Sequence, residues 1–188
     1  MTTRTAPPDT GRLLTVEEFA SLPEYESRTE LVRGRLVREP PAGFEHGHLA
    51  AVVAHRLKSF ADANGLGLVL AAETGFLLFD DPPTVRAPDA AFVAKERLPP
   101  DRHGFAHLAP DIAVEIVSPS NTVAQVQDKV CDYLDAGTRM VWIVEPRRQT
   151  VMVYRSRDDI HLLTGGDVID GGEVLPGFRL AVAELFAD

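Results

Sequence analysis

The sequence predicts an α/β fold in which a mixed β-sheet is flanked by helices on at least one face. The order of the expected elements is helix, antiparallel strands, helix, strand and hairpin, which is typical of this class. The chain has 188 residues, of which 45% are hydrophobic and 25% charged, an ordinary composition for a globular protein. We therefore expect one domain over residues 13–188, preceded by a disordered arm at residues 1–12, where no periodicity is found.

The first half of the chain supplies a short helix, a hairpin and a long helix. Thr15 with Glu18 is a capping-box pattern and predicts a helix through about Leu22. The run from Glu30 to Val37 is typical of a hairpin with a two-residue turn. Apolar residues at helical spacing predict a helix over residues 46–63. Strands are then expected at residues 66–72, 75–79 and 85–93, followed by a loop at 95–110.

The second half continues with a strand over residues 111–118. Capping residues at 118–122 predict a helix that runs to about Ala136 and is stopped by Gly137. Three further strands are expected at residues 139–144, 150–155 and 160–163. Two of them, 139–144 and 150–155, are so apolar that we expect an uncovered face and a two-fold homodimer.

Charge and cysteine content narrow the function classes. The formal net charge of −9, from 28 acidic and 19 basic residues, weighs against a protein that coats nucleic acid. It does not exclude a nuclease, because carboxylates that hold a metal raise the acidic count. The single cysteine, Cys131, excludes an intrachain disulfide. With no secretory signal and no apolar run of membrane-spanning length, we expect a cytoplasmic protein without membrane contact.

Two acids interrupt stretches that otherwise look buried. Asp89 lies in the apolar run 85–93, and Glu115 shares a strand face with Ala113 and Val117. A buried carboxylate is costly unless it is protonated, paired or bound to a metal. Two such charges ~4 Å apart repel by about 4 kcal/mol at an effective dielectric near 20, and a divalent cation removes that repulsion. The alternative is that each acid pairs with an arginine, Arg86 and Arg139 being the candidates.

Lys129 lies at the border of the apolar stripe of the helix after Glu115. A lysine there can simply extend its ammonium to solvent, or it can reach back toward Glu115. Two acids, a metal and a positioned lysine suit phosphodiester hydrolysis, because the metal activates water and the ammonium stabilises developing charge. His46, at the start of the long helix, is either a capping or surface residue or a neighbour of the acids.

Several segments together resemble a known family: ELVRGRLV, TVRAPDAAFV, APDIAVEIVSPSNT, KVCDYLDAG, VWIVEP and VLPGFRLAVAELF. They resemble a bacterial family of restriction-endonuclease-like proteins in the PD-(D/E)XK nuclease superfamily. The resemblance covers the chain from about residue 13. It implies a restriction-endonuclease-like core, a Mg²⁺ (or Mn²⁺) cofactor and endonuclease activity on DNA.

The resemblance also implies roles for four residues. Asp89 and Glu115 match the first and second acids of the motif, which hold the metal, and Glu30 matches an acid contributed early in the chain. Val117 occupies the usual lysine position, and Lys129 stands where this family moves the lysine. Two alternatives stay open: a catalytically inactive nuclease-like fold that serves as a binding or assembly module, and a phosphoesterase that acts on small nucleotides.

Overall fold

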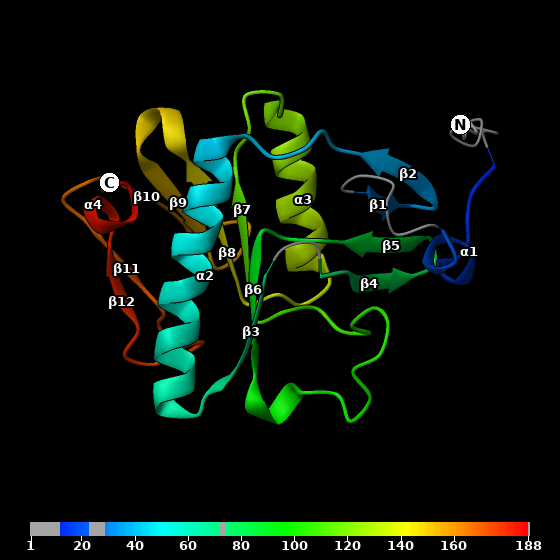
Figure 1. Ribbon diagram of the computed structural model, residues 1–188, viewed down its shortest axis with the longest axis horizontal. Helices are drawn as coiled ribbons and strands as arrows, with labels where there is room; N and C mark the ends of the chain where they lie inside the picture. The colour runs from blue at the N-terminus through cyan, green and yellow to red at the C-terminus, as the bar shows by residue number, and fades with distance from the viewer. Residues whose placement is uncertain (1–11, 23–28, 72–73, 188) are drawn as a thin grey trace, which may run out of the picture.

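The computed structural model describes residues 12–22, 29–71 and 74–187, and within them the elements form three β-sheets with flanking helices (Figure 1). The helices are α1 (Val16–Ala20), α2 (Phe44–Asn64), α3 (Val123–Asp135) and α4 (Val182–Leu185), with 3₁₀ turns η1 (Lys95–Arg97) and η2 (Pro146–Arg148). The strands are β1 (Thr29–Val32), β2 (Arg35–Arg38), β3 (Gly67–Ala71), β4 (Phe76–Asp80), β5 (Pro83–Arg86), β6 (Ala90–Ala94), β7 (Ile112–Ile116), β8 (Met140–Glu145), β9 (Thr150–Tyr154), β10 (Ile160–Leu163), β11 (Val168–Asp170) and β12 (Arg179–Ala181). The expected arm at residues 1–12 lies outside the described residues except for Arg12.

The large sheet has six strands in the order β10-β9-β8-β7-β6-β3. Only the β7–β8 pair within it is parallel, and α3 connects these two strands. Side chains on one face, such as Val114 and Trp142, pack with Val53 of α2, whereas those on the other face, such as Ala113, pack with Tyr133 of α3. This mixed sheet between helices confirms the predicted fold class.

A second, antiparallel sheet lies beside the large one, in the order β2-β1-β5-β4 (Figure 1, right). Its apolar face forms a small separate core with α1, built around Leu31, Leu77 and Val85. The hairpin β1–β2 turns at Arg33 and Gly34, both with positive φ. This is the two-residue turn that the sequence predicts, and a left-handed backbone at both central positions matches the twist of the paired strands.

The expected single strand at residues 85–93 is wrong. The chain leaves the small sheet at Arg86, the end of β5, and enters the large sheet at Ala90, the start of β6. Between them lies Pro88, which has no N–H to donate and a fixed φ, so a ladder cannot continue through it. Asp89 therefore stands at the junction of two sheets, and Val85 does not share a sheet with it.

Helix ends follow the sequence closely. Thr15 and Thr122 each form a capping box, with Glu18 and Gln125 respectively. Gly65 ends α2 in the left-handed conformation that favours glycine. These local signals succeed because capping satisfies backbone groups that the helix itself leaves unpaired.

The apolar strands β8 and β9 leave no uncovered face of the kind expected. Trp142, Ile143 and Val144 are fully buried within one chain, and so is Val151 of β9. The prediction that these two strands leave an uncovered apolar face, from which a homodimer was expected, is therefore wrong. Among the described helices, none is both long and apolar enough to span a membrane.

Candidate functional site

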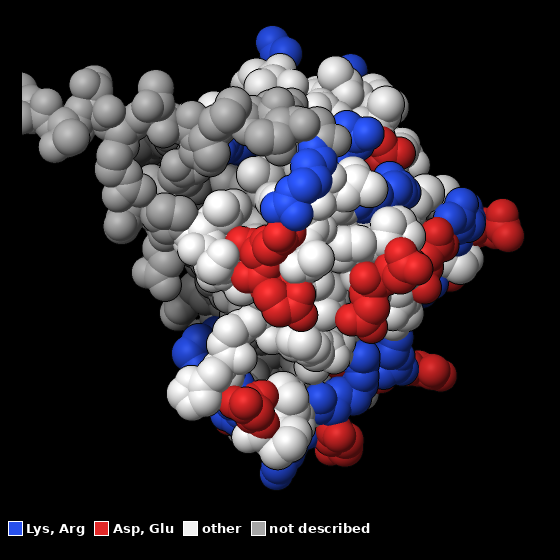
Figure 2. Space-filling model, turned by 90° about the vertical axis from the view of Figure 1, so that its right-hand side faces the viewer, with Lys and Arg blue, Asp and Glu red and all other residues white. Residues whose placement is uncertain are grey.

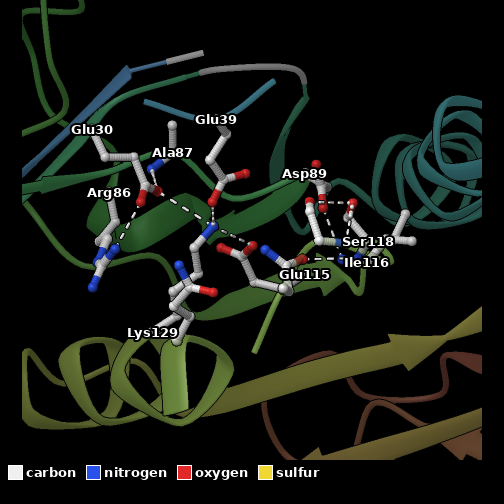
Figure 3. Close-up of polar contacts among 12 residues, drawn as sticks. Glu30, Glu39, Arg86, Ala87, Asp89, Glu115, Ile116, Ser118 and Lys129 are labelled. Atoms are coloured by element: carbon white, nitrogen blue, oxygen red, sulfur yellow. Dashed lines mark hydrogen bonds and ion pairs between the residues drawn. The ribbon is translucent and has the colours of Figure 1, made fainter. Parts of the chain in front are cut away.

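The C-terminal end of β7 carries a buried ion pair with α3. Glu115 Oε2 lies 2.9 Å from Lys129 Nζ, and both side chains are buried. Lys129 stands in the second turn of α3, so its side chain reaches back over the end of the strand that precedes the helix (Figure 3). Of the two possibilities that the sequence leaves open for Lys129, the structure shows the contact with Glu115 and not an extension to solvent.

Two more carboxylates surround the same ammonium. Glu39, directly after β2, lies 3.0 Å from Lys129 Nζ, and Glu30 of β1 lies 3.7 Å from it. Burial alone lowers the pKa of Lys129, but the charges of Glu115, Glu30 and Glu39 outweigh it, and the pKa lies above its usual value. Lys129 is therefore a fixed positive charge at neutral pH and is unsuited to act as a general base.

Glu30 is held by the small sheet. Arg86 Nη1 donates to its Oε2 at 2.7 Å, and the backbone N–H of Ala87 donates to its Oε1 at 2.9 Å. Arg86 also donates twice to Asp132 of α3, at 2.6 and 3.0 Å. Because these contacts are buried and charge-assisted, they fix the position of Glu30 against α3. They also raise the pKa of Arg86 despite its burial.

Glu115 is in a strongly perturbed environment. The hydroxyl of Tyr133 donates to its Oε1 at 2.7 Å. Burial is the main cause that raises the pKa of Glu115 from 4.5 to about 7; Lys129 opposes this shift, and Asp89 and Glu30 add to it. Burial and the neighbouring Glu115 charge likewise raise the pKa of Tyr133. A buried carboxyl with a raised pKa beside other acids is typical of functional sites.

Asp89 lies at the junction between β5 and β6, directly before β6. Its Oδ2 accepts a hydrogen bond from the backbone N–H of Ile116 at 2.8 Å, and its Oδ1 lies 2.8 Å from Nε2 of His46. The antiparallel register pairs Ala90, the first residue of β6, with Val114 of β7, so Asp89 directly precedes this pairing. Its charge adds to the rise in the pKa of Glu115. Figure 3 shows Asp89 on one side of Glu115 and the Lys129 cluster on the other.

The donor set fits a divalent cation that keeps several waters. Among the described residues, no group of three or more His, Cys, Asp and Glu side chains is arranged to hold a metal ion. Mg²⁺ needs fewer, because proteins usually bind it through one or two carboxylates together with water and substrate phosphate. Asp89 and Glu115 supply two such carboxylates. Burial is the main cause of the raised pKa of Glu115, and repulsion from Asp89, which a bound cation would relieve, adds to it.

The structure gives mixed results for the residues named from the sequence. It brings Glu30, Glu115 and Lys129 into one cluster, and it places Asp89 beside it with separate partners. The alternative prediction, that the two acids of the apolar strands pair with Arg86 and Arg139, is wrong. Arg86 instead binds Glu30 and Asp132, and Arg139 lies 3.8 Å from Asp111.

Sequence reasoning missed three members of the network, Glu39, Asp132 and Tyr133, and it named Arg86 with other partners than the structure shows. Glu39 follows β2, a strand with an exposed arginine at each end, and carries no apolar signal. Asp132 and Tyr133 do carry one, because they follow Lys129 by three and four residues and so share its helix face. His46 lies near the acids, as one of the two interpretations of that residue proposed.

The structure is an α/β fold with a mixed sheet, and buried acids lie where β6 and β7 meet. Residues 16–183 match the model of the Uma2 family, described as "Putative restriction endonuclease", and the chain belongs to that family. A solved structure described as "a putative nuclease belonging to DUF820 from Anabaena variabilis ATCC 29413" has the same fold, with a TM-score of 0.81. The two chains are 24% identical over 92% of this chain and 97% of that one. No curated protein matches the sequence.

Proposed function

We propose that this protein is an endonuclease that hydrolyses phosphodiester bonds in DNA with Mg²⁺ or Mn²⁺. Asp89 and Glu115 hold the cation, and Glu30 and Lys129 complete the catalytic set. The observation that carries the proposal is the contact of Lys129 Nζ with Glu115 Oε2 at 2.9 Å. Because Val117 fills the usual lysine position, a lysine from α3 at this point restores the charge that the superfamily pattern requires.

The residues of the chain divide the work. When bound, the cation polarises the phosphate and lowers the pKa of the attacking water. Lys129 contributes a fixed ammonium that stabilises the negative charge developing on the phosphate. Glu30 and Glu39 keep that ammonium in place and protonated. Tyr133 holds one oxygen of Glu115, which orients the carboxylate from within the core.

Two observations favour a second candidate, an inactive nuclease-like fold that serves as a binding or assembly module. All four carboxylate oxygens of Asp89 and Glu115 already have a hydrogen-bond partner in the protein. On the face shown in Figure 2, acidic and basic side chains are mixed and do not form one basic surface. An inert module needs no cation, so cation-dependent cleavage separates the two candidates.

The test is cleavage of plasmid and single-stranded DNA with Mg²⁺ or Mn²⁺. We expect the wild type to cut and Lys129→Met, which keeps the apolar stem and removes the charge, to lose about 10²–10³ in rate. Lys58→Met, which removes an exposed lysine of α2 paired with Asp62, is the matched control and should cut like the wild type. Equal cutting by Lys129→Met would refute the site assignment, and an inactive wild type would favour the inert module.

A double variant sharpens the role of the displaced lysine. Val117 and Lys129 line the same small pocket together with Glu115. Val117→Lys combined with Lys129→Met should therefore recover part of the activity, if the charge matters and not the helix that carries it. No recovery, with the double variant folded, would show that the position on α3 is itself required.

Assembly and location complete the proposal. We propose a two-fold homodimer, because two-fold dimers are the commonest closed assembly and the outer strand β10 exposes Ile160 and Leu162. We propose the cytoplasm as its location. We also propose that residues 13–188 fold as a single domain. Light scattering at micromolar concentration should give twice the chain mass of 20.5 kDa, and a 20.5 kDa particle would refute the dimer.

A further inference from the structure

The histidine on the first turn of α2 contacts an acid of the candidate cation site. His46 Nε2 lies 2.8 Å from Asp89 Oδ1, and the side chains are only 10% and 4% exposed. The helix that carries His46 covers the large sheet on the face opposite α3. His46 therefore connects the site to an element that supplies none of Glu30, Asp89, Glu115 or Lys129.

Asp89 depends on such a contact because of where it stands in the chain. It follows Pro88 in the junction between β5 and β6, outside the hydrogen-bonded ladder of either strand. Its carboxylate can rotate about two side-chain bonds unless partners hold both oxygens. Ile116 N–H from β7 holds Oδ2, and His46 from α2 meets Oδ1. Each oxygen has a second lone pair, so both can still face a cation.

The fold does not need His46 to place α2. The helix is anchored by its own apolar stripe of Leu49, Val53, Leu57 and Ala61, all buried in the main core. A polar contact at the first turn adds little to that docking. What His46 supplies instead is a contact with Oδ1 of the acid whose charge acts on Glu115.

We propose that His46 is a positioning residue for the cation site, which orients the Asp89 carboxylate toward the cation shared with Glu115. This inference rests on the proposed cation-dependent function. Outer partners that orient metal ligands are a general feature of metal sites, and their loss typically costs about 10–100-fold in metal affinity or activity. The first turn of α2 is thereby part of the proposed site, because the position of the helix determines where His46 meets the Asp89 carboxylate.

The experiment is a Mn²⁺ titration of the full chain by calorimetry, with four variants. Asp89→Asn removes the negative charge of a proposed cation ligand and should abolish detectable binding. His46→Leu should weaken Mn²⁺ binding about 10–100-fold. His46→Gln places an amide N–H close to the position of Nε2 and should recover most of the affinity. His48→Leu, an exposed histidine two residues along the same helix, is the matched control and should bind like the wild type.

The outcomes separate this inference from the proposed function. A wild type without Mn²⁺ binding would overturn both. Binding that Asp89→Asn removes but His46→Leu leaves unchanged would overturn only the positioning role, and so would His46→Gln binding as weakly as His46→Leu. If His46→Leu fails to fold, His46→Asn replaces it, because its shorter amide falls short of Asp89 while the side chain stays polar.

Discussion

Two buried acids at opposite ends of β7 have different surroundings. Asp111, directly before the strand, is fully buried, and Glu115, near its end, is 6% exposed. Asp111 has two cations near it: Arg97 at 2.9 Å and Arg139 at 3.8 Å, and the backbone N–H of Ala94 donates to it at 2.8 Å. Glu115 instead shares one ammonium with two other acids.

The comparison shows that burial of a carboxylate does not by itself mark a functional site. At Asp111 the positive charges match or exceed the negative one, and the arrangement ties a loop and two strands together. At Glu115, Lys129 faces three carboxylates, and Asp89, directly before β6, adds a fourth acid whose charge acts on Glu115. The excess of negative charge is therefore the property that favours a cation, and it distinguishes the candidate site from a structural clamp.

The largest effect on stability is expected for Lys129→Met. The substitution leaves Glu30, Glu39 and Glu115 without their shared cation, and breaking a buried ion pair from one side typically costs about 3–5 kcal/mol. The substitution should therefore lower the free energy of unfolding more than the same change at an exposed lysine. Urea denaturation measures the loss. A loss below 1 kcal/mol would mean that the acids are neutralised in another way.

The raised pKa of Glu115 gives the next effect. The folded state holds this proton up to about pH 7, whereas the unfolded chain releases it near its usual 4.5. The folded state therefore binds more protons between these values, and its stability falls as pH rises through this window, by about 3 kcal/mol in total. Urea denaturation at pH 5 and pH 8 tests this. The difference in free energy of unfolding between the wild type and Glu115→Gln should be less favourable to the wild type at pH 8 than at pH 5. A difference independent of pH would contradict the burial argument.

A smaller loss is expected at the other end of the strand. Asp111→Asn removes the charge that Arg97 and Arg139 contact and weakens the bond to Ala94 N–H, at a cost of about 1–3 kcal/mol. Because this acid belongs to a structural clamp, DNA cleavage well below the melting temperature should match the wild type. A cleavage defect in folded Asp111→Asn would remove the distinction between the two ends.

The same strand shows what sequence reasoning can and cannot predict. Glu115 was identified because an acid in an apolar alternation is conspicuous, and Lys129 because helical periodicity places it on the inward border. Asp111 directly precedes its strand and follows Pro110, where an acid looks like a loop residue, so its burial carries no local signal. Arg86 and Asp132 meet across 46 residues of chain, and such partners depend on how the two sheets join, which periodicity does not report.

The break at Pro88 is the clearest case of a missed signal. Residues 85–93 look like one strand by composition, yet the proline divides them between two sheets and places Asp89 at the junction. The physical rule was available in the sequence, because proline cannot donate to a central ladder. Its consequence for the site, a second acid held by α2 and β7, required the three-dimensional arrangement.

The most direct test of the central claim compares the two ends of β7 in one thermal-shift experiment with Mn²⁺. A ligand that binds only the folded state raises its stability by mass action, about 2.7 kcal/mol at 100 times the dissociation constant. We predict that the wild type and Asp111→Asn gain the same number of degrees on addition of Mn²⁺, whereas Glu115→Gln gains none. An undiminished response in Glu115→Gln, or its loss in Asp111→Asn, would contradict the assignment of the cation site to the Glu115 end.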